Sequence, residues 1–238
     1  MLIVTKLTTM ANILNIDTSS SICSVSLSIN GEICVGYESM KKMDHSTTLA
    51  PFVDKCLDFL REKDIKLDAV AVTLGPGSYT GLRIGLSMAK GLSFGFDIPL
   101  IALSSLEVMA VRAIFTYAEF TGEEYVIPMI DAKRMEVYTA VFSSDLSKVK
   151  DEEAKILDED SFAGMGDKKI VMIGDGIEKF KEISHLENAV FLGDGMAHAK
   201  YMPALSEKKF RNKEFADVAY TVPSYLKEYR ATKPKIKI

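Results

Sequence analysis

The chain has 238 residues, 47% of them hydrophobic, and its 29 basic and 33 acidic residues give a net charge of −4. This apolar content suffices for one large domain or two small lobes with their own cores. The charge balance excludes a strong intrinsic attraction to polyanions, so a partner would have to supply most contacts to any nucleic acid. No apolar run approaches the ~20 residues that a membrane span requires.

The chain ends and the cysteines indicate a cytoplasmic protein. Residues 1–9 carry no recognisable secretion signal and precede the first convincing strand, so we expect an extension outside the core fold. Cys23, Cys34 and Cys56 match neither a zinc ribbon nor a CxxC pair. Their odd number favours reduced thiols.

The first third of the chain predicts an antiparallel meander followed by alternating helices and strands. Residues 12–35 hold apolar runs with a period of two around Asn30-Gly31, a strong hairpin signal. Helical spacing then predicts a helix over 46–62, although Pro51 suggests a later first turn. Further predicted elements are a strand at 69–74, a helix at 80–94, a strand at 99–103 and a helix at 106–117. This alternation predicts an α/β fold with a partly parallel sheet.

A change in composition near residues 121–124 predicts a second lobe. We expect strands at 126–130, 136–142 and 170–173, a charged loop at 144–160, helices at 197–209 and 213–221, and a frayed basic tail at 231–238.

The glycine-spaced segment 75–95, GPGSYTGLRIGLSMAKGLSFG, is the most distinctive part of the sequence. It lacks the third glycine of a dinucleotide fingerprint and the Gly-Lys-Ser/Thr of a P-loop. Gly81, Gly85 and Gly91 lie inside the predicted helix, each costing ~1 kcal/mol relative to alanine, so close approach of another backbone is expected. Intramolecular packing and a subunit interface both satisfy this expectation.

A second motif is the polar turn after the first predicted strand. Asp17, Thr18 and Ser19 stand where actin-like ATPases place a phosphate-binding turn, in which an aspartate holds the metal and backbone amides face the anion. The alternative is a hairpin whose side chains only satisfy turn amides.

Several segments together resemble the TsaB (YeaZ) family over Met10 to about Arg230. They are ILNIDTSSS (13–21), DHSTTLAPFV (44–53), AVTLGPGSYTGLRIGLSMAKGLS (71–93), DAKRMEVYTAVF (131–142) and PSYLKE (223–228). The resemblance implies a two-lobed actin-like ATPase superfold (shared with sugar kinases and heat-shock chaperones) with a reduced second lobe. We accordingly expect a first lobe at 10–104, a second at 105–222, and a segment at 223–238 that returns toward the first lobe and ends in the basic tail.

The resemblance also implies a function. Such proteins assist a TsaD-type catalytic subunit in threonylcarbamoylation of adenosine in tRNA, together with a TsaE-type ATPase and a TsaC-type synthase. We expect a non-catalytic assembly subunit that needs no cofactor, forms a homodimer when alone, and could share an ATP or ADP site at the subunit junction. The alternatives are an ATP-dependent transferase or kinase acting through Asp17, and a metallopeptidase-like protein.

The resemblance assigns the partner interface to the helices of the first lobe. The expected interface residues are His45, Leu49, Phe52, Val53, Tyr79, Thr80, Gly81, Leu82, Arg83, Ile84, Gly85, Leu86, Met88, Ala89 and Lys90. On this hypothesis the glycine face is a docking surface, and Gly85→Leu should abolish association without disturbing the fold. TsaD-like proteins bind their metal through two histidines, whose places Ser105 and Met109 occupy here, so we expect no metal site.

Overall fold

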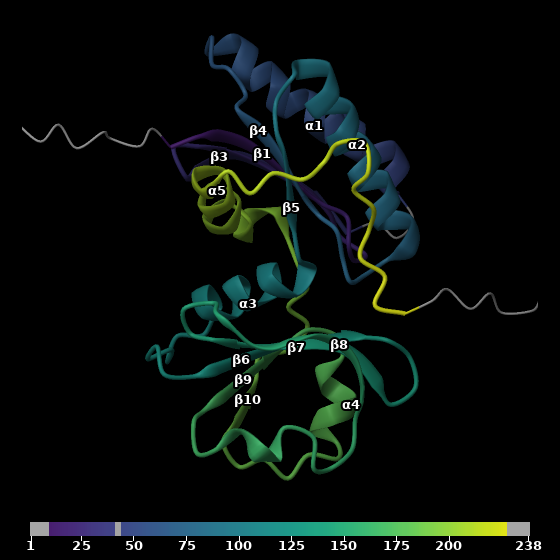
Figure 1. Cartoon of the computed structure of the whole chain (residues 1–238), viewed down its shortest axis with the longest axis vertical. Coiled ribbons are helices and arrows are strands. Elements are labelled where there is room, and N and C mark those ends of the chain that lie inside the picture. The colour runs from purple at the N-terminus through teal and green to yellow at the C-terminus, as the bar shows by residue number, and fades with distance from the viewer. Residues whose placement is uncertain (1–9, 41–43, 228–238) are drawn as a thin grey trace, which may run out of the picture.

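The computed structural model describes residues 10–40 and 44–227. It has two lobes, each built on a five-stranded mixed sheet (Figure 1). The first sheet has the order β3-β2-β1-β4-β5. Its strands are β1 (Asn12–Asp17), β2 (Cys23–Ile29), β3 (Glu32–Ser39), β4 (Ala69–Thr73) and β5 (Leu100–Leu103). β1, β2 and β3 pair antiparallel, as the hairpin signal predicted, and β4 and β5 run parallel to β1.

The second sheet repeats this arrangement in the order β10-β9-β6-β7-β8. Its strands are β6 (Tyr125–Asp131), β7 (Glu136–Ser143), β8 (Lys148–Ile156), β9 (Ile170–Ile173) and β10 (Ala189–Phe191). β6, β7 and β8 form the antiparallel meander, and β9 and β10 add in parallel. Counted from its own first strand, each sheet therefore has the order 3-2-1-4-5.

Side-chain alternation along the strands creates three cores. In β1 and β4, Leu14, Ile16, Val70 and Val72 face helices α1 (His45–Glu62) and α2 (Tyr79–Phe96). Their neighbours Ile13, Ala69 and Ala71 face a central core that also holds Val126 and Ile130 of the second sheet. Successive strand residues point to opposite faces, so buried parallel strands are apolar on both sides. The third core lies beyond the second sheet.

The central layer contains α3 (Ser105–Thr116), α5 (Pro203–Asn212) and the 3-10 turn η2 (Ala199–Tyr201). Figure 1 shows α3 between the sheets and α5 against the first one. Ser206 donates to Asn15 Oδ1 at 2.8 Å, and Glu207 Oε2 accepts the Ala11 amide at 3.1 Å. The chain therefore returns to the first lobe at α5, earlier than the predicted boundary at residue 223.

Beyond the second sheet the lobe is thin. Between β8 and β9 it has only the three-residue turn η1 (Ala163–Met165), and between β9 and β10 the five-residue helix α4 (Ile177–Lys181). The corresponding connections of the first lobe are α1 and α2, with 18 residues each. The reduced second lobe expected from the family resemblance consists of these shortened connections.

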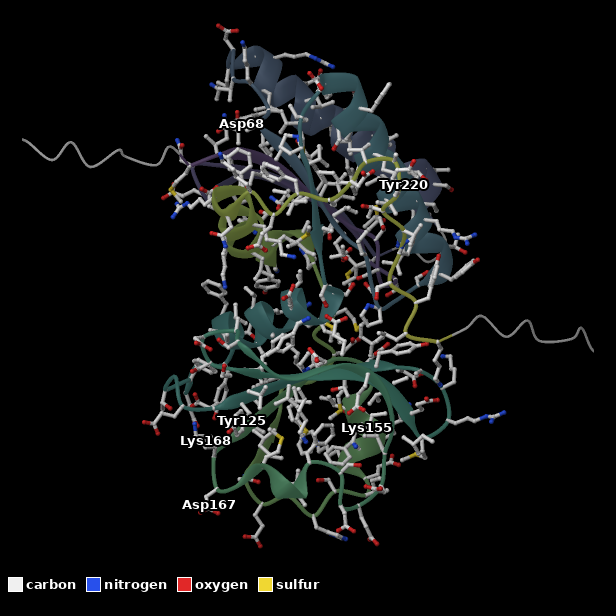
Figure 2. The ribbon with its side chains drawn as sticks, in the orientation of Figure 1. Asp68, Tyr125, Lys155, Asp167, Lys168 and Tyr220 are labelled. Atoms are coloured by element: carbon white, nitrogen blue, oxygen red, sulfur yellow. The ribbon has the colours of Figure 1, made fainter. Side chains whose placement is uncertain are left out.

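After α5 the chain crosses the first lobe as an irregular segment with a turn at 218–220; we call this segment, residues 216–227, the strap. Ala216 N donates to Leu100 O at 2.8 Å, Lys90 Nζ donates to Ala219 O at 3.0 Å, and Ser224 N donates to Leu74 O at 2.8 Å. Figure 2 shows Tyr220, on the strap, beside the upper helices. The strap then reaches the second lobe through an ion pair between Lys227 and Glu136.

Two predicted elements are wrong. The expected loop at 144–160 contains strand β8, and the expected helix at 213–221 is turn and strap. β8 is an edge strand whose residues are mostly charged and exposed, so it lacks the apolar alternation that marks a strand. The basic tail and residues 1–9 lie outside the described residues. Within the described part of the chain, no helix is long and apolar enough to cross a membrane.

Candidate partner interface and the turn beneath it

Helix α2 begins at a sharp turn after β4. Ser78 caps it, because its side chain accepts the Gly81 amide at 3.2 Å. The Ser78 amide in turn donates to Ser19 O at 2.7 Å. Gly75 has φ +113°, a conformation that favours glycine. The turn thus fixes the first turn of α2 directly on the Asp17–Ser19 segment.

The glycine face of α2 points into the protein, which corrects the expectation of an external glycine surface. A Cβ at Gly81 would collide with Thr18 O, and a Cβ at Gly85 would collide with Thr18 Oγ1. Thr18 Oγ1 also donates to Gly81 O at 2.8 Å. The close backbone approach predicted from the glycines is therefore intramolecular, and Gly85→Leu would disturb the fold itself.

The burial of the predicted interface residues divides them into two groups. His45, Leu49, Val53, Gly81, Leu82, Gly85, Leu86 and Ala89 are buried within the chain. They contribute to the first-lobe core, so they cannot form a docking surface in this conformation. His45, for instance, places Nε2 3.0 Å from Ser20 O. Phe52 is half-buried and stacks on Tyr37, with ring centroids 5.6 Å apart.

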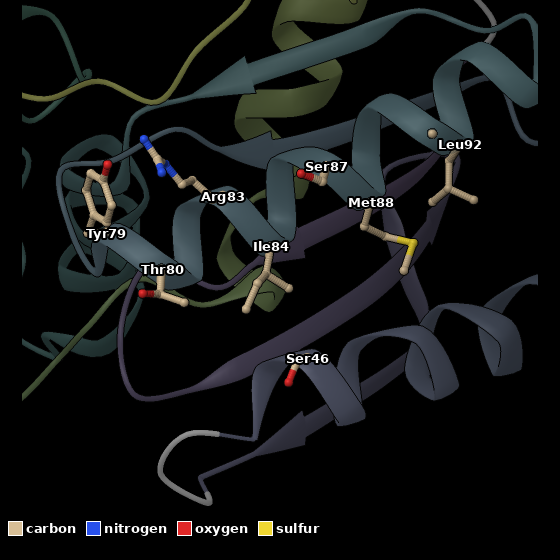
Figure 3. A pocket seen from close by; sticks show the side chains of 9 residues that line it. Ser46, Tyr79, Thr80, Arg83, Ile84, Ser87, Met88 and Leu92 are labelled. Atoms are coloured by element: carbon tan, nitrogen blue, oxygen red, sulfur yellow. The ribbon is translucent and has the colours of Figure 1, made fainter.

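Apart from Lys90, the remaining predicted residues of α2 line a groove of about 710 Å³ beside α1. The groove is lined by Ser46, Tyr79, Thr80, Arg83, Ile84, Ser87, Met88, Gly91 and Leu92. Figure 3 shows Ile84, Met88 and Leu92 pointing from α2 toward the side where Ser46 of α1 lies. These three residues recur every fourth position, so they form one stripe along the helix. Lys90 lies off this stripe and binds the strap.

The sequence prediction did not assign Ser46, Ser87, Gly91 and Leu92 to the interface. Gly91 differs from the other two glycines because a Cβ there would meet nothing within 4 Å. Thr80, Ile84, Met88 and Leu92 recur every fourth position, and this spacing was the sequence feature that could have identified the groove-facing side of the helix. Tyr225 was not among the predicted interface residues either, and its ring lies tilted by 32° against that of Tyr79 with centroids 5.2 Å apart.

The expected phosphate-binding turn is closed. Asp17, Thr18 and Ser19 are each at most 1% exposed. Asp17 Oδ1 accepts from Ser19 N, Ser19 Oγ and Thr73 Oγ1, while Oδ2 is buried without a hydrogen-bond partner among the described residues. Burial raises the pKa of this carboxyl above its ordinary value of 3.8, despite the opposing hydrogen bonds. The turn contacts the first turn of α2, and the side chains of Asp17, Thr18 and Ser19 are closed off from any ligand in this conformation.

The two positions where the family resemblance led us to expect substituted histidines also lie inside the protein. Ser105 and Met109 are fully buried, and Ser105 Oγ has no hydrogen-bond partner in the described structure. Over residues 10–40 and 44–227, His, Cys, Asp and Glu side chains nowhere gather in groups of three that could hold a metal ion.

Comparison with known proteins places the chain in a family. A family model described as "TsaD: tRNA N6-adenosine threonylcarbamoyltransferase" matches residues 39–237. "tRNA threonylcarbamoyladenosine biosynthesis protein TsaB" of Bacillus subtilis (strain 168) is 32% identical over 223 residues, covering 90% of this chain and 93% of the relative. The Escherichia coli (strain K12) protein of that name is 35% identical over 133 residues, covering 56% of this chain and 55% of the relative.

Solved structures agree. "YeaZ from Pseudomonas aeruginosa" superposes with a TM-score of 0.75 at 26% identity, covering 91% of this chain and 100% of that chain. A second Pseudomonas aeruginosa structure, described as similar to peptidase YEAZ, gives a TM-score of 0.77 at 26% identity over 92% of this chain and 100% of that one. With its two lobes of equal strand order, the chain has the α/β actin-like fold and belongs to the TsaB (YeaZ) family.

Proposed function

We propose that this chain is a non-catalytic subunit in tRNA threonylcarbamoyladenosine biosynthesis and that it docks a TsaD-type catalytic subunit through the α1–α2 groove. The names of its relatives support the pathway. The observation that carries the docking role is the half-buried apolar stripe of Ile84, Met88 and Leu92, which lines the groove beside α1. A continuous apolar stripe left open on a folded protein marks an interaction surface.

The groove suits a helix of a partner with the same fold. The TsaD family model extends over residues 39–237, which include both α1 and α2, so a TsaD-type chain would present a comparable helix pair. Side chains of one helix then pack into the groove of the other. Ser87 and Gly91 add little side-chain volume at the edge of the groove, which favours such close packing.

The non-catalytic part of the proposal rests on the interior of the molecule. Helix α2 packs closely on the turn with Asp17, and Ser105 and Met109 are buried at the positions expected to hold histidines in a catalytic relative. These observations disfavour a transferase or kinase that acts through Asp17. In this proposal the chain requires no cofactor, any ATP or ADP lies at the junction with the partner, and a TsaE-type ATPase, a TsaC-type synthase and tRNA belong to the same machinery.

Reconstitution of the tRNA modification from purified components tests the function. We expect product with the full set of components and at least tenfold slower formation when this chain alone is omitted. Undiminished modification without the chain would refute the proposed role. Threonylcarbamoyl transfer by this chain in the absence of the TsaD-type subunit would refute its non-catalytic character.

A further inference from the structure

Arg83 stands at the edge of the groove without a counter-charge. Its side chain is exposed, and within the described chain no carboxylate lies within ion-pair distance of its guanidinium. Arg83 is the one charged residue among the nine that line the groove. Packing alone does not require a charged residue at this position.

Two tyrosines hold this guanidinium in place. Its central carbon lies 4.0 Å from the centroid of the Tyr79 ring, and Nε donates to Tyr225 Oη at 3.0 Å. Figure 3 shows Arg83 and Tyr79 together at one end of the groove. Nε is engaged by Tyr225 and one face of the guanidinium lies over the Tyr79 ring, so a second group would bind through the terminal nitrogens of the planar fork.

The strap is held in place on both sides of Tyr225 by contacts to the two lobes. Ser224, next to Tyr225, donates its amide to Leu74 O at 2.8 Å, and Lys227 forms the ion pair with Glu136 of the second lobe. Tyr225 is thus tied on both sides. A pre-ordered arginine loses little side-chain entropy on binding, and fixed arginines and tyrosines are typical of residues that dominate interface energies.

The positive charge of Arg83 indicates which chemical group of a partner would bind at this end of the groove. The fork of arginine matches a carboxylate, with which it forms two parallel hydrogen bonds. A second copy docked symmetrically in this groove would present the same nine residues, none of which carries a carboxylate that could pair with Arg83.

We propose that Arg83 is the polar anchor of the groove and binds an aspartate or glutamate of the catalytic partner, beside the apolar contacts of Ile84 and Met88. Tyr79 and Tyr225 act as positioning residues for this anchor. The inference rests on the proposed function, since it names the chemistry that the TsaD-type partner presents to this groove.

Calorimetric titration of the cognate TsaD-type subunit into the full chain, at low and high salt, tests the anchor. Arg83→Gln should weaken binding roughly 30-fold and flatten its salt dependence, because the screened charge pair is gone. Arg83→Lys keeps the charge but loses the fork, so about tenfold weaker binding is expected. Tyr225→Phe should weaken binding a few-fold and leave the salt dependence unchanged. Arg134→Gln, an exposed arginine of the second lobe, should bind like the unchanged chain.

Two further variants separate the anchor from the docking role. If Met88→Asp abolishes binding while Arg83→Gln binds normally, the anchor is overturned and the docking role stands. If Met88→Asp binds normally, the groove is not the docking surface and both proposals fail. Arg83→Glu combined with single Asp/Glu→Arg reversals in the partner should restore binding for one reversal, and restoration by none would overturn the ion pair. A symmetric dimer of the free chain that persists in the presence of the partner would also overturn it.

Discussion

The two lobes share one strand order but differ in what covers their outer faces. In the first lobe, 18-residue helices α1 and α2 cover the outer face, whereas the second lobe has η1 and α4, with three and five residues, in the same places. An open helix pair can pack against another helix pair. The proposed docking surface therefore lies on the lobe whose outer face carries two long helices.

The first strand of each sheet ends in an aspartate, and these two aspartates have opposite surroundings. Asp17 is buried and its pKa is raised, as described above. Asp131 is partly exposed, and although its burial opposes ionisation, hydrogen bonds from Lys179 and Lys133 lower its pKa below 3.8. In the first lobe α2 covers the aspartate at the end of the first strand, whereas in the second lobe the corresponding aspartate lies in a partly exposed turn.

The largest expected effect concerns the close contact between α2 and Thr18 in the first lobe. Gly81→Ala should lower the free energy of unfolding by roughly 1–3 kcal/mol, because the added methyl group meets the rigid Thr18 carbonyl. Gly91→Ala is the matched control in the same helix and should be neutral or stabilising by up to about 1 kcal/mol. Thermal and urea unfolding of both variants would measure the difference. Equal stability would mean that α2 does not close on the turn.

A smaller effect is expected at the two aspartates, with opposite signs. Asp131→Asn should destabilise the chain by about 1 kcal/mol at pH 7, because it removes the ion pair in which Asp131 Oδ1 lies 2.5 Å from Lys179 Nζ. The folded pKa is lowered, so this contribution is present above pH 3.8 and disappears as the pH falls through the folded pKa.

Asp17→Asn should be neutral or stabilising at pH 7. The asparagine Oδ1 can still accept the three hydrogen bonds, and the buried charge is gone. The folded pKa of Asp17 is raised, so the unchanged chain loses stability as the pH rises through that pKa, and the advantage of asparagine should vanish below pH 3.8. Unfolding curves from pH 3 to 7 measure both variants, and a loss of stability in Asp17→Asn at pH 7 would contradict this account.

The smallest effect is expected where the strap joins the lobes. Lys227→Met should cost at most about 1 kcal/mol, since the Lys227–Glu136 pair is partly exposed. Hydrogen exchange at the Ser224 amide should nevertheless accelerate, while exchange in β4 stays unchanged. Unchanged exchange at Ser224 would show that the strap is held without this ion pair.

Much of this fold follows from local patterns in the sequence. Helices α1, α2 and α3 and the buried strands carry strong apolar periodicity, and Asn30-Gly31 marks a hairpin. β8 escapes prediction because an exposed edge strand needs no apolar face. The predicted helix at 213–221 fails because this segment is held by contacts to distant residues such as Leu100 and Lys90.

The candidate site was predictable only in part. Helical periodicity shows that Gly81 and Gly85 share a face, but it does not show whether Thr18 or a partner covers that face. The helical period places Ile84 and Met88 on the groove side only once Gly81 and Gly85 are known to face the interior. The contact between Arg83 and Tyr225 joins residues 142 positions apart, and no local pattern encodes such a pairing.

The affinity of the TsaD-type subunit for Met88→Asp, measured beside Ile156→Asp, tests most directly whether the first-lobe groove is the docking surface. Ile156 is an exposed apolar residue of β8, 72% exposed, so it controls for added surface charge. We predict that Met88→Asp binds at least 30-fold more weakly than the unchanged chain, since a charge in a desolvated apolar contact costs 2 kcal/mol or more, about 30-fold in affinity. Ile156→Asp should bind normally. Normal binding by Met88→Asp, or equal loss in both variants, would contradict the account.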